Sequence, residues 1–365
     1  MQFDQECRNI LVVLPNWVGD VVMATPVLRA LRAHHRQARI TYLGPQSSLD
    51  VLSPLKWADS AVADLSRRRP KRLANFFRTA NRLRKDRFDL AILMPNSFRS
   101  AILTKLSACQ QIAGYDRDGR GWLLTDRLAP KRDAQGRFVA MPTLQYYRDL
   151  AQFTGVPVDD MRMELPVDEA HERSAGNLLA EMGADAARPI VMLNPGAAFG
   201  PSKMWEPPHY GALADMLIEQ RGAQIIINAA PNERHIAAQV QAHMRHAPLL
   251  SFAQRDNSIG LLKALLARCD LLVTNDTGPR HIGAALGIGV VTVFGSTDPR
   301  WAQIDYPRER VVRLDVSCSP CQSKLCLQVP GPSYHQCMSA ITPQQVALPS
   351  LELLDSAAKP TGVRP

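Results

Sequence analysis

The sequence predicts an α/β protein built from two doubly wound parallel sheets. Short apolar runs such as ILVVLP (10–15) and FDLAILM (88–94) are long enough for buried strands, and amphipathic helical segments separate them. The same alternation resumes after a turn-rich, acidic junction at 155–189. The chain has 365 residues, which suits two domains of roughly 150 residues each.

Each element follows from its local pattern. Apolar runs predict strands at 10–15, 38–44 and 88–94 in the first half, and at 189–196, 223–231, 270–276 and 290–295 in the second. Helices are expected at 208–221, 232–246 and 258–268. We therefore place an N-terminal domain at 1–170, a C-terminal domain at 171–347 with a Cys-rich loop at 318–337, and a tail at 348–365.

The charge of the chain is concentrated in one segment. The formal net charge is +9, and residues 67–87 carry ten Lys or Arg against one acid. Within this segment KRLANFFRTANRLRK (71–85) predicts a helix whose apolar stripe, from Leu73 to Leu83, packs on the core, with the basic residues opposite. A local basic patch suits an acidic partner, although a solvated helix face is the simpler alternative.

The expected location is cytoplasmic. The first residues, MQFDQECRNILVVLP, carry acids and lack the long apolar run of a secretory signal. No stretch reaches the ~18 uncharged apolar residues that a spanning helix needs. Any membrane contact is therefore expected to be peripheral, on the inner face of the cytoplasmic membrane.

Three polar loops follow predicted strands directly, where ligands bind to open parallel sheets. In LPNWVGDVVMATP (14–26), Gly19 permits a tight turn and Asp20 stands at a helix start, where the helix dipole favours an ionised carboxylate. Such a group can act as a general base, and the alternative is an ordinary N-cap.

The other two loops lie in the second half of the chain. LNPGAAFGPSKMWEPPHY (193–210) combines a small-residue turn with Lys203, a cation suited to a phosphate oxygen. TNDTGPRHIGAALG (274–287) passes from a strand through Thr277 and Gly278 into a helix start that can hold a diphosphate, with His281 in its first turn. A solvated lysine and a structural histidine are the alternatives.

Together these segments resemble one known family. NWVGDVVMATPVLRAL, NPGAAFGPSKMWEP, NDTGPRHIGAALG and VVTVFGSTDPRW are similar, in this order, to segments of the family-9 glycosyltransferases, the ADP-heptose:lipopolysaccharide heptosyltransferases. The resemblance spans about residues 8–346 and is strongest to the heptosyltransferase II branch. It implies the GT-B fold, with two Rossmann-like domains facing a cleft, and an inverting transfer from ADP-L-glycero-D-manno-heptose to the lipopolysaccharide inner core.

The resemblance also implies site residues. Asp20 matches the catalytic base and Lys203 the lysine at the donor diphosphate. The remaining donor positions are Gly196, Ala197, Ala198, Glu233, Asp276, Thr277, Gly278 and His281. Where some relatives carry threonines in the phosphate loop, this chain has Ala197, Ala198 and Phe199, so backbone amides and Lys203 must hold the phosphates.

The basic segment gains a candidate partner from the resemblance, because inner-core lipopolysaccharide is anionic. Acceptor binding is expected at Asn16, Arg67, Arg68, Arg69, Lys71 and Arg72. The neighbouring face could rest on the inner membrane.

Four cysteines are clustered toward the end of the chain. Cys318, Cys321, Cys326 and Cys337 have the spacing C-x2-C-x4-C-x10-C, which is compatible with a structural zinc site or an iron–sulfur cluster. Reduced thiols without metal are the alternative, and the transfer chemistry requires no cofactor.

Besides a catalytically inactive protein that binds a nucleotide sugar, two other functions are compatible with the sequence. One is a GT-B enzyme with a different nucleotide sugar or acceptor. The other is a nucleic-acid-binding protein using residues 67–87, which is disfavoured because no nucleic-acid motif accompanies the charge.

Overall fold

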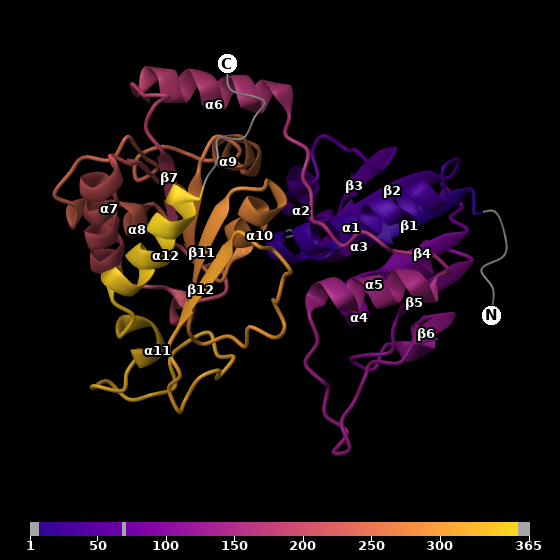
Figure 1. The fold of residues 1–365 in the computed structure, drawn as a ribbon. Helices are drawn as coiled ribbons and strands as arrows, with labels where there is room; N and C mark the ends of the chain where they lie inside the picture. Colours follow the sequence, from indigo (N-terminus) through magenta and orange to yellow (C-terminus); the bar gives the residue numbers. More distant parts are fainter. Residues whose placement is uncertain (1–6, 68–70, 357–365) are drawn as a thin grey trace. The chain divides into compact units, whose positions relative to one another are not determined.

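The computed structural model describes residues 7–67 and 71–356, without the side chain of Arg67. The chain divides into two compact units (Figure 1). The N-terminal unit comprises Met1–Pro166 with Arg300–Ile304, and the C-terminal unit comprises Val167–Pro299 with Asp305–Pro365. The boundary expected from the sequence was 170/171, and the packing of residues 300–304 with the first unit was not anticipated.

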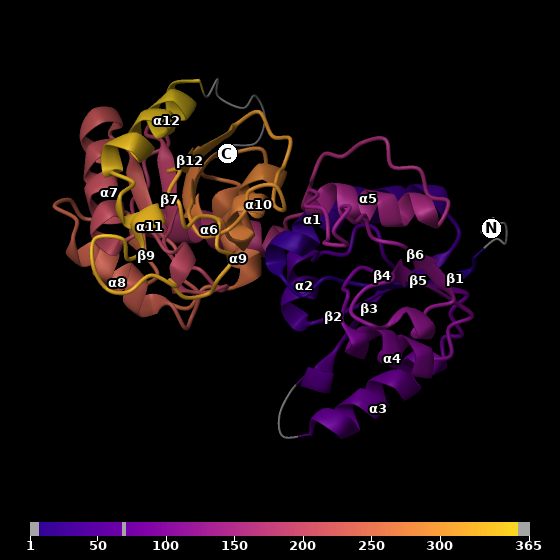
Figure 2. The same cartoon turned by 90° about the horizontal axis from the view of Figure 1, so that it is seen from below.

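The N-terminal unit is a six-stranded parallel sheet in the order β3-β2-β1-β4-β5-β6. Its strands are β1 (Asn9–Val13), β2 (Arg39–Gly44), β3 (Ser60–Ala63), β4 (Leu90–Leu93), β5 (Gln111–Tyr115) and β6 (Asp126–Leu128). Its helices are α1 (Val18–His34), α2 (Gln46–Val51), α3 (Arg72–Arg84), α4 (Phe98–Leu106) and α5 (Thr143–Phe153). Helix α1 packs on α5, and α3 packs on α4 on the opposite face of the sheet (Figure 2).

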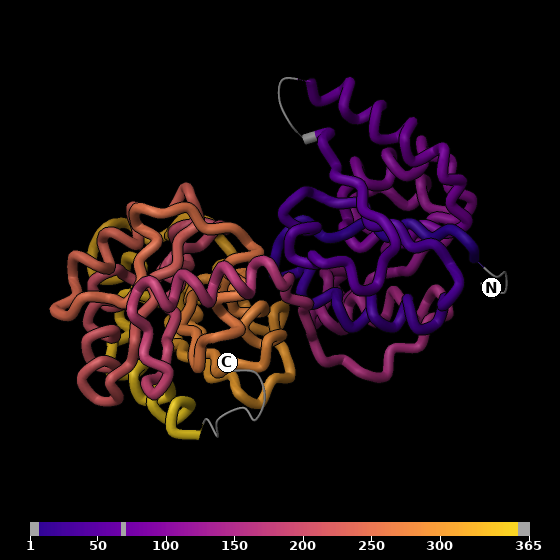
Figure 3. Tube along the Cα trace, turned by 90° about the horizontal axis from the view of Figure 1, so that it is seen from above, coloured from indigo at the N-terminus to yellow at the C-terminus, as the bar shows by residue number. Residues whose placement is uncertain are grey.

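The C-terminal unit repeats this plan in the order β12-β11-β10-β7-β8-β9, again all parallel. Its strands are β7 (Ile190–Asn194), β8 (Gln224–Ile227), β9 (Leu250–Ser251), β10 (Leu271–Asn275), β11 (Gly289–Phe294) and β12 (Glu309–Arg313). Its helices are α6 (Glu169–Glu181), α7 (Pro207–Arg221), α8 (Arg234–Ala242), α9 (Ile259–Leu266), α10 (Gly278–Ala285), α11 (Gln336–Ser339) and α12 (Pro343–Asp355). The trace in Figure 3 follows these elements.

Both sheets have the Rossmann strand order, so the prediction of two Rossmann-like domains is confirmed. In each unit the strand order reverses between the first and fourth strands, β1 and β4 in one and β7 and β10 in the other. Loops that leave these strands at their carboxyl ends diverge there and leave room for a ligand. The expected strands at these four positions are all present.

Helix α3 has nearly the predicted bounds, but only part of its apolar stripe packs on the core as predicted. Ala80 and Leu83 are buried, and Phe76 packs against the same core. Leu73 and Phe77, from the same apolar stripe, are 76% and 55% exposed. The stripe is wider than the surface that the sheet and α4 offer, so one edge of it faces outward.

The predicted tail begins too early. Helix α12 runs to Asp355, buries Val346, Ala347, Ser350 and Leu353, and packs on α7 and β11. A capping box at its start, in which Thr342 and Gln345 bond each other's backbone amides, fixes where it begins. None of the described helices is long and apolar enough to cross a membrane.

Helix α12 supplies a test of this packing. Leu353 is 1% exposed, so Leu353→Ala is expected to lower the free energy of unfolding by about 2–5 kcal/mol through lost contacts and a cavity. Leu348→Ala, on the same helix but 64% exposed, should change it by less than about 0.5 kcal/mol. Urea unfolding of both variants checks this. Equal effects would show that residues 343–355 form a detached tail.

Candidate functional site

Two asparagines fasten the loops at the carboxyl ends of β7 and β10. The Asn275 amide donates to the carbonyl of Pro195 at 2.8 Å, and its oxygen accepts from the backbone N–H of Trp205 at 3.0 Å. The Asn194 amide donates to the hydroxyls of Thr274 (3.1 Å) and Thr277 (3.3 Å). Because both asparagines are buried, these bonds hold the 195–205 loop beside the start of α10.

Asp276 is the centre of the charges at this site. Lys203 Nζ donates to its Oδ2 at 2.7 Å and to its backbone carbonyl at 2.9 Å. Arg280 Nη1 lies 3.3 Å from Oδ1, and the Thr297 hydroxyl donates to Oδ2 at 2.8 Å. Burial by itself raises the pKa of Asp276, but the charges of Lys203 and Arg280 outweigh it and hold that pKa below its ordinary value. Asp276 is therefore ionised at neutral pH.

Arg280 is held in turn by a second carboxylate. Its Nε and Nη2 donate to the two oxygens of Glu309 at 2.6 and 3.0 Å, and Thr292 donates to Glu309 Oε1 at 2.7 Å. This bidentate geometry fixes the guanidinium, whose side chain is 2% exposed. Asp276 and the first turn of α10 are thereby tied to strands β11 and β12.

Helix α10 begins at this cluster. Thr277 is its N-cap in an extended conformation, Gly278 is its first residue and proline occupies the first turn, as predicted. The first amides of a helix lack partners within the helix and point toward any anion bound there. His281 is buried, and its Nδ1 has no partner among the residues described. Burial, followed by the charge of Arg280, lowers the pKa of His281 to about 3, so its imidazole is neutral.

Glu233 lies against the loop that follows β7. Its carboxylate lies near the backbone amide of Ala197. A Cβ on Gly196 would overlap this carboxylate, so only glycine permits the approach. Burial raises the pKa of Glu233, and the Ala197 amide offsets part of that rise. The structure thus joins Glu233, Gly196 and Ala197, while Ala198 is exposed in the same loop.

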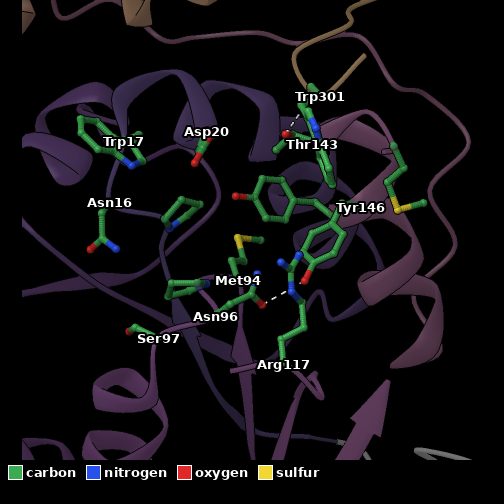
Figure 4. A pocket seen from close by; sticks show the side chains of 14 residues that line it. Asn16, Trp17, Asp20, Met94, Asn96, Ser97, Arg117, Thr143, Tyr146 and Trp301 are labelled. Atoms are coloured by element: carbon green, nitrogen blue, oxygen red, sulfur yellow. Dashed lines mark hydrogen bonds between the residues drawn. The ribbon is translucent and has the colours of Figure 1, made fainter. Parts of the chain in front are cut away.

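The N-terminal unit has a pocket at its own switch point. The pocket has a volume of about 270 Å³ and opens where the loops after β1 and β4 diverge. Its lining includes Asn16 from the first loop, Asp20 from the first turn of α1 and Asn96 from the second loop (Figure 4). Helix α1 begins at Val18 with Trp17 as N-cap, so Asp20 is not the capping residue. Figure 4 shows its carboxylate directed toward the pocket.

Buried tyrosines and an arginine support this pocket. Burial and then the charge of Asp20 raise the pKa of Tyr147 well above its ordinary value, so the phenol stays protonated beside that carboxylate. The Tyr146 hydroxyl donates to Asn96 Oδ1 at 2.9 Å, and Arg120 Nη2 donates to the same oxygen at 3.2 Å. Asn96 is thereby oriented from both sides.

Arg120 places a positive charge beneath the pocket. It is fully buried and donates to the carbonyls of Pro95 and Tyr115. Burial lowers the pKa of Arg120 to about 10, which still leaves it protonated at neutral pH. Arg117 lines the pocket itself, with its guanidinium 3.8 Å from the centre of the Phe138 ring. The pocket therefore combines one carboxylate with two nearby cations.

Sequence reasoning missed several residues of this pocket, including Asn96, Arg117, Tyr146 and Trp301. One signal was present, because PNS (95–97) follows the predicted strand at 88–94 directly. Arg117 and Trp301 come from irregular segments that carry no such signal.

One family of known proteins matches most of the chain. The sequence model of glycosyltransferase family 9 (heptosyltransferase) matches residues 76–330, which include Lys203, Glu233 and the start of α10. The chain belongs to glycosyltransferase family 9. It is a glycosyltransferase, as predicted from its motifs.

Relatives within family 9 are similar over nearly the whole chain. Lipopolysaccharide heptosyltransferase 2 of Salmonella typhimurium is 29% identical over 361 residues, which cover 97% of this chain and 100% of that protein. The Escherichia coli protein of the same name is 28% identical over 93% of this chain and 96% of its own length. The solved structure of E. coli ADP-heptose lps heptosyltransferase II superposes with a TM-score of 0.76 at 26% identity, covering 96% of this chain and 100% of that chain.

The predicted basic acceptor patch is only partly visible. Arg68, Arg69 and the side chain of Arg67 lie outside the described residues. Lys71 and Arg72 are exposed at the start of α3, and neither lines the pocket that contains Asp20. Asn16, predicted with them, does line it.

The four clustered cysteines lie around a separate cavity of about 230 Å³ in the C-terminal unit. Burial and then the three neighbouring thiols raise the pKa of Cys337 to about 11. No group of three or more His, Cys, Asp or Glu side chains among the described residues is arranged to hold a metal ion. The metal-site prediction therefore has no support in this arrangement.

The buried His281 gives a pH prediction. Its folded pKa of about 3 lies below the ordinary value of 6.5, so the unfolded chain binds an extra proton between these values. Stability should be complete above pH 6.5 and fall by about 1.4 kcal/mol per pH unit as the pH drops toward 3. His281→Gln should flatten this slope, measured as urea midpoints from pH 7.5 to 4.5. Part of the pH dependence should remain in His281→Gln, because the pKa of His35 is also lowered, to about 4. An unchanged slope in His281→Gln would contradict a buried neutral imidazole.

Proposed function

We propose that this glycosyltransferase transfers heptose from ADP-L-glycero-D-manno-heptose to the inner core of lipopolysaccharide, with inversion at the sugar carbon. The observation that carries the proposal is the near full-length similarity to proteins named heptosyltransferase 2. These relatives span both units, so the similarity includes the Asp20 loop as well as the Lys203 and Asp276 loops.

The C-terminal unit would bind the nucleotide sugar. Lys203 has three N–H donors, and two of its contacts go to Asp276, so one donor remains to meet a diphosphate oxygen. The start of α10 adds backbone amides and a partial positive charge. As the bond between sugar and ADP breaks, negative charge grows on the diphosphate, and these groups stabilise it.

Two further residues fit the donor. Glu233 lies near the Ala197 amide and has carboxylate lone pairs that can accept from ribose or heptose hydroxyls. His281 is neutral, so at the diphosphate it can donate a hydrogen bond from one nitrogen without adding a charge. No cofactor is needed for this chemistry.

The N-terminal unit would bind the acceptor sugar. Asp20 in the pocket would take the proton from the attacking hydroxyl, a role that typically contributes roughly 10²–10⁴ in rate. The oxygen then bonds to the sugar carbon as ADP departs. Arg117 in the lining and Arg120 beneath it favour a carboxylated or phosphorylated acceptor, which agrees with an inner-core saccharide.

The direct test incubates the purified chain with ADP-heptose and defined truncated lipopolysaccharides, and follows ADP release together with the mass of the acceptor. Heptose addition to one truncation supports the proposal. ADP release without a heptosylated product, or activity only with a different nucleotide sugar, would refute it. We further propose that the enzyme works at the cytoplasmic side of the inner membrane, where such a donor and acceptor meet.

Substitution of the proposed base gives a sharper prediction. Asp20→Asn should lower kcat by about 10²–10⁴ because the amide cannot accept the proton. Affinity for ADP, measured by calorimetry, should stay within about twofold, since no donor contact is assigned to Asp20. Asp50→Asn, which changes a carboxylate on α2, serves as the control and should retain full turnover. An Asp20→Asn enzyme that is as fast as the wild type would rule out this base.

A further inference from the structure

Helix α3 presents an unusual outward face. Leu73 and Phe77 are four residues apart, so they share one side of the helix, and both are largely exposed. Exposed apolar side chains occur singly on most proteins, but an aliphatic and an aromatic side chain together on one outward helix face indicate a contact surface. Figure 2 shows α3 at the outer edge of its own unit.

Unpaired positive charges surround these two side chains. Residues 71–87 contain seven Lys or Arg and one acid, and all seven basic residues are exposed. No ion pair joins any of the seven to a carboxylate in the part of the chain that the structure describes. Arg99, on the neighbouring helix α4, contrasts with them because it pairs with Asp64 at 2.9 Å. The charge on α3 is therefore available to an external anion.

The inner side of α3 is firmly anchored. Ala80 and Leu83 are buried, and the Asn75 amide donates to the carbonyl of Leu65 at 3.3 Å. The Arg99 guanidinium lies 5.8 Å from the centre of the Phe76 ring. The outward face of α3 is thus held in place, and its exposed apolar side chains do not contribute to the core of this unit.

We propose that α3 docks the protein on an anionic lipid bilayer. Leu73 and Phe77 enter the interface between headgroups and acyl chains, and the basic side chains contact lipid phosphates. An exposed leucine favours lipid over nucleic acid, which would engage the cations and stack on Phe77 but gain little from an aliphatic side chain. The docking concerns where the enzyme works, so it can be tested without assuming the transfer reaction.

The test measures binding of the full chain to vesicles of equal parts phosphatidylglycerol and phosphatidylcholine, with pure phosphatidylcholine for comparison. The wild type should sediment with the anionic vesicles only, and less at high salt. Each basic residue near such a surface contributes roughly fivefold in partitioning, so Arg78→Gln/Arg82→Gln/Lys85→Gln should lose at least about tenfold. Leu73→Ser/Phe77→Ser should also lose binding, and Phe77→Trp should retain it.

Matched control variants show whether a loss of vesicle binding is specific to α3 or follows from removing any exposed charge or apolar side chain. Arg36→Gln/Arg127→Gln/Arg310→Gln removes three exposed charges from other elements, and Leu348→Ser removes an exposed leucine from α12. Both should bind as the wild type does. The proposal is overturned if these controls lose as much binding, or if the wild type ignores anionic vesicles. It is also overturned if the chain prefers duplex DNA or RNA and that binding is unaffected by Leu73→Ser/Phe77→Ser.

Discussion

The contact between Lys203 and Asp276 is the constraint on which the C-terminal site depends. A lysine on a loop has many conformations, and this one is held by two bonds to a single residue at the end of β10. Asp276 can hold it because Arg280 and Thr297 also bond its carboxylate, which keeps the buried charge compensated. The cation is therefore in place before any anion arrives, and such preorganisation is what makes an electrostatic site effective.

The N-terminal unit has the same fold but different charged groups at its switch point. Its switch point holds a carboxylate, and the cations lie beside and below it in Arg117 and Arg120. Arg120 is buried without an ion pair in the described residues, and carbonyl groups satisfy its donors instead. Its positive charge interacts with the nearby carboxylates of Asp118 and Asp116, and an anionic sugar in the pocket would be attracted to it as well. The same topology thus carries a different arrangement of carboxylates and cations at each of its two switch points.

The sequence predicted those parts of the protein that have a regular pattern. A strand, a glycine turn and a helix follow one another at 271–285. The sequence therefore predicted that Asp276 and His281 lie where the strand gives way to the helix. Arg117 lies on an irregular segment, and no periodicity assigns it to a pocket. The apolar stripe on α3 shows another limit. Residue spacing predicts which side chains share one face of the helix, but it does not predict which of them, such as Leu73, remain exposed.

The C-terminal helix was missed for a different reason. Thr342 and Gln345 form a capping box that signals a helix start, but Pro349 lies within the segment, and proline usually ends a helix. This proline is tolerated because the helix packs firmly on α7 and β11. Tertiary packing outweighs local propensity here, as it often does.

The most direct test of the central claim is a double-mutant cycle on ADP affinity, using Lys203→Met, Asp276→Asn and the two together, measured by calorimetry. If Asp276 acts by positioning Lys203, the two changes are coupled. Each single variant should then lose much of the affinity that the pair provides, and the double variant should lose less than their sum by at least about 1 kcal/mol. Losses that simply add would show that Asp276 does not position Lys203 for the diphosphate, and the account of this site would be wrong.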